Sequence, residues 1–121
     1  MDVHAPLGSF EEQVLLAVLR VGTDAIGTAV RREIEHVTGR GVAIGAVYAT
    51  LDRLDEKGYL ASRRFRAASG TRRSFTVSAA GAQALEATRA MRERLWRGVD
   101  LEPLLDHPPA GHRPAPGRAG P

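Results

Sequence analysis

Between residues 44 and 77 the spacing of apolar residues changes from a helical period to a strand period within a few positions. Apolar residues recur at steps of three and four from Ile44 to Leu54, which places them on one side of a helix. Gly58 then provides a helix stop. Phe75 and Val77 alternate with polar residues, as in a strand. The sequence therefore predicts a helix that is followed directly by a β-hairpin.

The outer side of this helix carries very small side chains at Gly45, Ala46 and Ala49. A helix with such a surface can approach a broad partner closely, and Arg53 adds a positive charge to the same side. Tyr48 and Thr50 flank the apolar stripe, where a hydroxyl group could reach a phosphate. We interpret the segment as a DNA recognition helix. The alternative is an amphipathic core helix whose small outer face has no function.

The predicted hairpin has strands at residues 59–65 and 73–77, joined by a turn at residues 67–71. It carries five arginines among the eleven residues 63–73, with no acidic residue between them: Arg63, Arg64, Arg66, Arg72 and Arg73. Because arginine binds phosphate bidentately, this cluster indicates contact with a nucleic-acid backbone. The alternative is a solvated hairpin whose charges only prevent association at its edge.

The first predicted helix, residues 9–21, is apolar nearly all round in its middle. Ser9 and Glu12 have the spacing of a capping box at its start. An apolar surface of this width must be covered on more than one side. We therefore expect either the central helix of a monomer or a contact with a partner subunit.

A second helix is predicted at residues 25–38, with Asp24 as its cap. Its apolar stripe consists of Ile26, Val30, Ile34 and Val37. Gly39 ends this helix, and a short glycine-containing turn leads to the recognition helix. Two helices joined in this way make a helix-turn-helix.

The last predicted helix, residues 79–99, begins after Ser78 as its cap. It is too long to pack wholly on a domain of this size, and arginines interrupt its apolar surface. We interpret it as a dimer arm that packs against the first helix of a second copy; the alternative is a solvent-facing terminal helix. The predicted dimer contacts are Leu15, Leu19, Leu85, Thr88, Met91, Leu95 and Val99.

The whole pattern predicts a mainly α fold with a small β-hairpin, a winged helix-turn-helix plus a C-terminal dimerisation helix. We divide the 121 residues into an N-terminal arm (1–8), a DNA-binding domain (9–78), a dimerisation helix (79–100) and a tail (101–121). The tail is rich in proline and glycine, so we expect it to be disordered.

Composition excludes several function classes. The chain has no cysteine, and its four histidines lack a metal-ligand spacing, so we expect no metal and no cofactor. No glycine-rich phosphate loop or nucleophile motif is present, which argues against an enzyme. The longest apolar run is far short of a membrane span, and we expect a cytoplasmic protein with no membrane contact.

Residues 45–58 resemble the recognition helix of PadR-family transcriptional regulators: a glycine, a Val-Tyr pair, a leucine, an Arg-Leu pair and a final glycine. Residues 75–81 are similar to the family segment that joins the wing to the last helix, and residues 7–11 and 15–19 also look familial. The resemblance covers about residues 7–99. It implies a winged-helix homodimer that binds a palindromic operator on double-stranded DNA, usually as a repressor.

The resemblance also implies roles for particular residues. Tyr48 matches a family tyrosine that points to phosphate contact, and Arg53 matches a basic position. Ala43 stands where a capping serine or threonine is usual, so this helix start is weakly capped. Some members release DNA when a flat aromatic compound binds between the last helices, and Trp96 would stack on such an effector. Alternatively, Trp96 packs in the dimer interface.

The leading hypothesis is therefore a sequence-specific DNA-binding transcriptional regulator. The alternative is a winged-helix protein-interaction module without DNA binding, for which the small outer face of the recognition helix and the modest net charge of +3 leave room.

Overall fold

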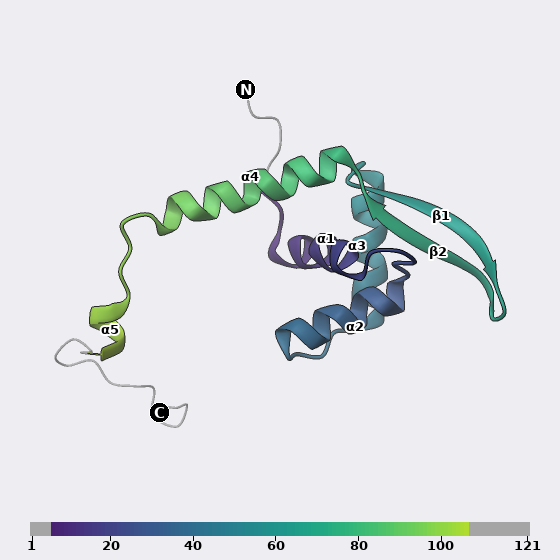
Figure 1. The fold of residues 1–121 in the computed structure, drawn as a ribbon, viewed down its shortest axis with the longest axis horizontal. Helices are drawn as coiled ribbons and strands as arrows, with labels where there is room; N and C mark the ends of the chain where they lie inside the picture. The colour runs from purple at the N-terminus through teal and green to yellow at the C-terminus, as the bar shows by residue number, and fades with distance from the viewer. Residues whose placement is uncertain (1–5, 107–121) are drawn as a thin grey trace. The chain divides into compact units, whose positions relative to one another are not determined.

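The computed structural model describes residues 6–106 (Figure 1). Their elements in chain order are α1 (Ser9–Val21), α2 (Gly27–Thr38), α3 (Ile44–Glu56), β1 (Leu60–Ala67), β2 (Gly70–Val77), α4 (Ala79–Trp96) and α5 (Glu102–Asp106). The predicted fold class, mainly helical with one antiparallel hairpin, is confirmed. The chain forms two compact units that divide between Met91 and Arg92.

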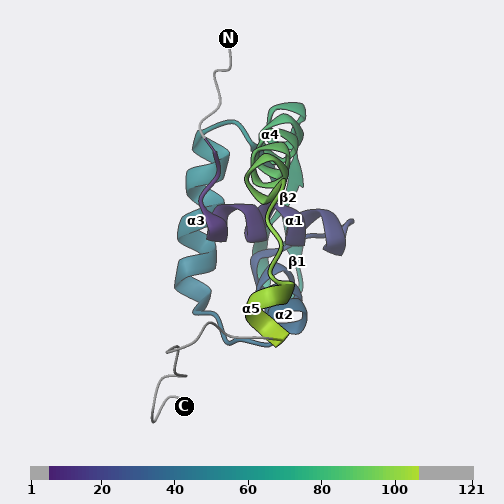
Figure 2. The ribbon, with the colours of Figure 1, turned by 90° about the vertical axis from the view of Figure 1, so that its left-hand side faces the viewer.

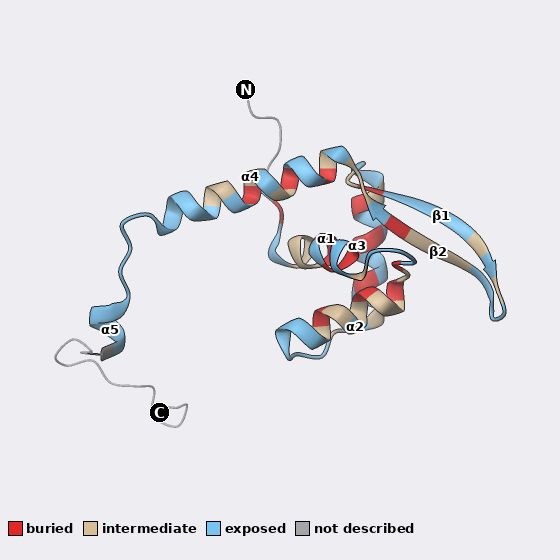
Figure 3. Ribbon diagram, viewed as in Figure 1, coloured by how far each residue is buried: buried red, intermediate tan, exposed pale blue. Residues whose placement is uncertain are grey.

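In the first unit, α1, α2 and α3 pack on one another around a shared core, with α3 beside α1 (Figure 2). Val47, Leu51 and Leu54 of the predicted stripe are fully buried, and Phe75 from the hairpin joins them. Figure 3 shows buried positions in red on α1, α3 and β2. The helical period of residues 44–54 therefore predicted correctly which side of α3 faces the core.

The predicted helix stops are confirmed. Gly39 has a left-handed φ of 71° and donates its N–H to the Glu35 carbonyl, which closes α2. Gly58 has a φ of 81° directly after α3. Ala43 is the N-cap of α3 and offers no side-chain hydrogen bond, as expected for alanine.

Two predicted caps were wrong. The N-cap of α1 is Gly8, and Glu11, not Glu12, reaches back to accept the Gly8 N–H at 3.0 Å. Asp24 does not cap α2, because it lies in a turn with a φ of 59°. The helix starts at Gly27, since Ala25 and Ile26 pair with β2 instead: the Phe75 N–H donates to the Ala25 carbonyl.

The turn of the helix-turn-helix is tied to α2 by a carboxylate. Glu35 accepts the Val42 N–H at 2.8 Å and lies 3.4 Å from the Arg31 guanidinium. The Val42 N–H and then Arg31 hold the pKa of Glu35 below its ordinary value, against the effect of burial. This contact orients the chain as it enters α3.

The hairpin is longer and tighter than predicted. Its register runs from Leu60 opposite Val77 to Ala67 opposite Gly70, so only two residues form the turn. Side chains directly opposite each other share a face, and faces alternate along a strand. Arg64, Arg66 and Arg73 therefore share the face of Phe75, whereas Arg63 and Arg72 lie on the other face.

Two predicted dimer contacts are occupied within the protomer. Leu15 is fully buried in the core, and Thr88 is 3% exposed and accepts the Leu7 N–H at 3.1 Å. Leu85 is partly buried against the same core. Leu7, assigned to the N-terminal arm, is thus part of the folded domain. Residues 1–5 of that arm lie outside the described residues.

The second unit differs from the prediction of a disordered tail from residue 101 onward. Glu102–Asp106 forms α5, and Glu102 donates its N–H to the Asp100 carboxylate at 3.1 Å. Residues 107–121 lie outside the described residues. The last predicted helix, residues 79–99, ends three residues earlier, at Trp96, and Gly98 follows with a φ of 79°.

Ser78 caps α4 as predicted, accepting the Gly81 N–H at 3.1 Å. A methyl group on Gly81 would collide with the Tyr59 carbonyl oxygen, so Gly81→Ala is expected to lower the free energy of unfolding by about 1–3 kcal/mol. Gly45→Ala is the matched control, because no atom lies within 4 Å of its Cβ position. Urea unfolding measures both, and a G81A protein as stable as wild type would contradict this close approach.

Candidate nucleic-acid interface

The outer face of α3 is open to solvent. Gly45, Ala46 and Ala49 are all exposed, as the sequence predicted, and Asp52 continues this face with a side chain that is 59% exposed. No described side chain covers the Cβ position of Gly45. The outer-face side chains on the first two turns of α3 are thus short, and a binding partner could approach the helix backbone closely.

Tyr48 is placed by a glycine on the neighbouring helix. A Cβ on Gly27 would collide with the Tyr48 ring and hydroxyl, so the ring packs directly on the first residue of α2. Tyr48 remains 39% exposed. Its hydroxyl group is therefore held near the start of α2, where the helix dipole favours an anion.

A hollow of about 270 Å³ opens between α3 and the hairpin. Its walls are Ile26, Tyr48, Arg64, Thr71, Arg72 and Arg73. A tyrosine hydroxyl, a threonine hydroxyl and the guanidinium of Arg64 around one concave surface suit a phosphate group. The hollow joins residues of α3 and the hairpin into one surface.

Arg64 and Arg66 are exposed on the hairpin face that also carries Phe75. Within residues 6–106, no carboxylate forms an ion pair with either guanidinium. These two side chains are therefore the wing cations with the most capacity to bind an external anion.

Arg73, which the sequence predicted as a phosphate contact, is paired within the protomer. Its guanidinium lies 3.0 Å from the Asp52 carboxylate and 3.6 Å from that of Asp55, and 4.8 Å from the centre of the Phe75 ring. Ser62 donates to the same Asp55 at 3.0 Å. Arg73 thus joins the hairpin to α3 and sets the position of the wing.

Arg72, on the other face of the hairpin, donates from its Nε and Nη2 atoms to the Ser69 hydroxyl at 3.1 and 2.8 Å. These bonds hold its guanidinium beside the turn. Arg63 on the same face lies 5.9 Å from the centre of the Phe65 ring. The five wing arginines therefore divide into separate groups, which their sequence clustering did not reveal.

Thr50 cannot contact a phosphate as predicted, because it is 3% exposed. It lies three residues after Val47 and four before Leu54, so it shares their buried side of α3. Its hydroxyl accepts a hydrogen bond from Arg53 at 3.2 Å. Arg53 also lies 3.5 Å from Glu11 of α1, with half of its side chain exposed.

Glu11 was missed by the sequence interpretation and fixes α1 to the end of α3. Its Oε2 atom accepts from Lys57 at 2.8 Å and lies beside Arg53, while its Oε1 atom accepts the Gly8 N–H. The Lys57 hydrogen bond is the largest cause that lowers the pKa of Glu11, opposed by burial and aided by Gly8 and Arg53.

Glu11→Gln is expected to reduce the decrease in unfolding free energy that occurs as the pH falls. The folded pKa of Glu11 lies below its ordinary value of 4.5, so its stabilising effect is present above that pH and is lost as the pH falls through the lowered pKa. At neutral pH the variant should lose about 1 kcal/mol of unfolding free energy. Urea unfolding from pH 7 to pH 3 measures the unfolding free energy of both proteins. If this free energy changes with pH equally in the variant and the wild type, ionised Glu11 does not stabilise the fold.

The part of the chain that the structure describes was also compared with the requirements of a metal site and of a membrane-spanning helix. Within residues 6–106, no group of three or more histidine or acidic side chains is arranged to hold a metal ion. None of the described helices has the length and apolar character needed to cross a membrane.

Comparison with known proteins extends this description. The profile of the transcriptional regulator PadR-like family matches residues 15–87. No curated protein matches the chain. Among solved structures, a PadR family transcriptional regulator from Eggerthella lenta is similar, with a TM-score of 0.61 and 23% identity over 78% of this chain and 81% of that one.

Two further structures share the fold. RosR of H. salinarum has a TM-score of 0.62 at 21% identity, over 78% of this chain and 81% of that chain. The Orc1 protein of Aeropyrum pernix, solved in complex with DNA, has a TM-score of 0.61 at 20% identity, over 77% of this chain and 26% of its own. At these identities the likeness shows a shared fold.

Proposed function

Because the chain belongs to the PadR-like family, whose members are transcriptional regulators and not enzymes, we propose that it is a cytoplasmic repressor that binds a palindromic operator as a homodimer. In this proposal α3 enters the major groove of DNA, and the hairpin contacts the flanking backbone. The two α3 helices of a dimer would occupy successive major grooves, about one helical turn apart.

One observation supports the proposed DNA-binding surface. The exposed small residues of α3 lie beside the hollow formed by Tyr48, Arg64 and Thr71, so a base-facing surface and a phosphate-facing surface are continuous. The A. pernix Orc1 protein, which shares this fold, was solved in complex with DNA. The shared fold covers 26% of that protein.

Titration of the protein into a duplex from its own upstream region, against a scrambled duplex at two salt concentrations, tests the proposal. Tighter binding to the native duplex that persists at the higher salt supports a sequence-specific regulator. Equal, salt-sensitive binding to both supports DNA binding without this operator. Failure to bind either duplex at low salt would overturn the proposal in favour of a protein-interaction module.

The proposed homodimer uses surfaces that the protomer leaves uncovered. Leu19, Leu95 and Val99 of the predicted dimer contacts are more than half exposed. Met91 is partly buried. Leu15 and Thr88 are excluded from this interface because the core of the protomer buries them.

The proposed effector is a small, flat aromatic compound that stacks on Trp96, which is 58% exposed. Trp96 is the only tryptophan in the chain, so its fluorescence reports directly on this position. Binding should quench the emission and release the operator at the same concentrations. Quenching without release would show that stacking does not control DNA binding, and the repressor would then lack this effector mechanism.

A further inference from the structure

The Asp52 carboxylate lies on the outer face of α3, the face that the proposed function directs toward DNA. Asp52 follows Gly45 by seven positions and Ala49 by three, so the three residues lie along one line on the helix. Its side chain is 59% exposed. About 4.5 Å separates Ala49 from Asp52 along the helix axis. If Ala49 faces a base pair, the Asp52 carboxylate therefore lies close to the edge of a neighbouring one.

A carboxylate at this position cannot add affinity for the phosphate backbone, because both groups are negative. Like charges that meet across an interface weaken binding. Asp52 can contribute only where the DNA offers a hydrogen-bond donor. In the major groove those donors are the exocyclic amino groups of cytosine and adenine. The position of Asp52 therefore favours a role in selecting a base.

Arg73 offsets the charge of Asp52 and holds its carboxylate in place. An Nη1 atom of the guanidinium lies 3.0 Å from Oδ1 of Asp52, and its Nη2 atom lies 3.6 Å from Asp55. The same guanidinium is 4.8 Å from the centre of the fully buried Phe75 ring. An acceptor that is positioned before binding loses less conformational freedom on contact, which favours a directional hydrogen bond.

Among the four bases, cytosine presents the edge that best suits a fixed carboxylate. Its N4 amino group donates, and cytosine itself has no acceptor beside this group in the major groove. The N6 amino group of adenine lies beside the N7 acceptor, which repels a carboxylate. Thymine presents its O4 acceptor there, and guanine presents N7 and O6. A carboxylate therefore binds cytosine and disfavours the other three bases.

We propose that Asp52 is a specificity-determining residue, whose carboxylate accepts a hydrogen bond from the N4 amino group of a cytosine in the major groove. Arg73 is the positioning residue for this contact. The inference rests on the proposed function and names one base that the proposed operator contains. On a palindrome bound by a homodimer, each half-site carries this cytosine.

Selection of bound duplexes from a pool of random sequence, with wild type and two variants, tests the inference. Wild type is expected to enrich a palindrome with cytosine at one position of each half-site, preferred at least about fivefold over the other bases. Asp52→Ala should enrich the same palindrome without that preference. Asp52→Asn should prefer adenine there, because a carboxamide donates to N7 and accepts from the N6 amino group.

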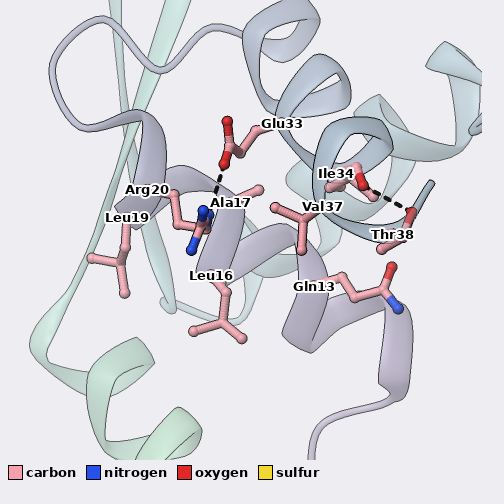
Figure 4. Close-up of a pocket in the computed structure, with 9 residues that line it drawn as sticks. All are labelled: Gln13, Leu16, Ala17, Leu19, Arg20, Glu33, Ile34, Val37 and Thr38. Carbon is pink, nitrogen blue, oxygen red and sulfur yellow. Dashed lines mark hydrogen bonds and ion pairs between the residues drawn. The ribbon is translucent and has the colours of Figure 1, made fainter. Parts of the chain in front are cut away.

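Two further variants are controls for the loss of an ion pair alone. Asp55→Asn weakens the second contact of Arg73, but Asp55 is directed to the hairpin, where it accepts from Ser62 at 3.0 Å. Glu33→Gln removes the partner of Arg20, 2.7 Å away, at a groove whose lining residues come from α1 and α2 (Figure 4). Both variants should keep the cytosine preference of wild type, with circular dichroism to confirm the fold.

A chemical change in the DNA gives a readout that a purely structural role of Asp52 would not alter. In the selected duplex, N4-methylcytosine replaces the cytosine, so a methyl group takes the place of the amino hydrogen that faces the major groove, and pairing with guanine is kept. Wild type should lose at least about fivefold in affinity. Asp52→Ala should bind the two duplexes equally. Fluorescence anisotropy with labelled duplexes measures the four affinities.

Two results would overturn the inference and leave the proposed function intact. The first is that Asp52→Ala and Asp52→Asn enrich the wild-type sequence with unchanged base preferences. The second is that the N4-methyl group weakens binding of wild type and Asp52→Ala by the same factor. If wild type enriches no sequence even at low salt, the proposed function itself fails, and the inference fails with it.

Discussion

Ala49→Glu is expected to abolish operator binding, with a loss of affinity of at least about 100-fold. A carboxylate on the exposed face of α3 would meet the negative potential of the DNA groove, and such a like-charge contact costs several kcal/mol. The added side chain also prevents the close approach that the small residues permit. Fluorescence anisotropy with a labelled operator measures the affinity.

Two control variants separate the causes of this loss. Ala49→Gln adds similar bulk without charge, so it should lose less affinity than Ala49→Glu. Ala82→Glu makes the acidic change on the exposed surface of α4 and should bind DNA like wild type. Wild-type affinity for Ala49→Glu itself would mean that this face of α3 does not meet DNA.

The Arg64→Ala, Arg66→Ala double variant is expected to weaken binding to operator and scrambled duplexes alike, by about 100-fold in all. Each arginine contributes a charge-assisted contact to phosphate, which is worth roughly 1.5 kcal/mol or more. Loss of two phosphate contacts should also reduce the slope of log affinity against log salt by about 2. Titrations at four or more salt concentrations give both quantities.

The other wing arginines provide contrasts. Arg63→Ala, on the opposite face of the hairpin, should change the salt slope less than the double variant does. Arg73→Ala should lower the free energy of unfolding by about 1–2 kcal/mol, because it removes contacts to Asp52, Asp55 and Phe75. A double variant with an unchanged salt slope would remove Arg64 and Arg66 from the phosphate contacts.

Sequence patterns predicted the parts of the fold that depend on neighbours along the chain. The apolar period of residues 44–54 identified the core side of α3, and Gly39 and Gly58 gave the helix ends. The motif order was enough for the family resemblance. The site was predicted less completely, since three small residues of α3 and Tyr48 are exposed as expected, whereas Thr50 is buried.

The missed features have a common physical cause. The start of α2 shifts because Ala25 pairs with Phe75, fifty positions away. Gly27 gave no local signal that it makes room for Tyr48 on another helix. Acidic residues at Asp52 and Asp55, three apart on α3 before an arginine-rich hairpin, were the one available sign that an arginine would be held within the protomer.

The sequence by itself determined that α1 to α4 are helices, that a hairpin follows α3 and which side of α3 is apolar, because these follow from local periodicity and glycine positions. The tertiary structure decided which polar groups remain available to a partner. Arg64 and Arg73 are alike in sequence, yet only Arg73 is paired, because the packing of the hairpin brings it to Asp52 of α3. Such pairing depends on distance in space, which residue spacing along the chain does not encode.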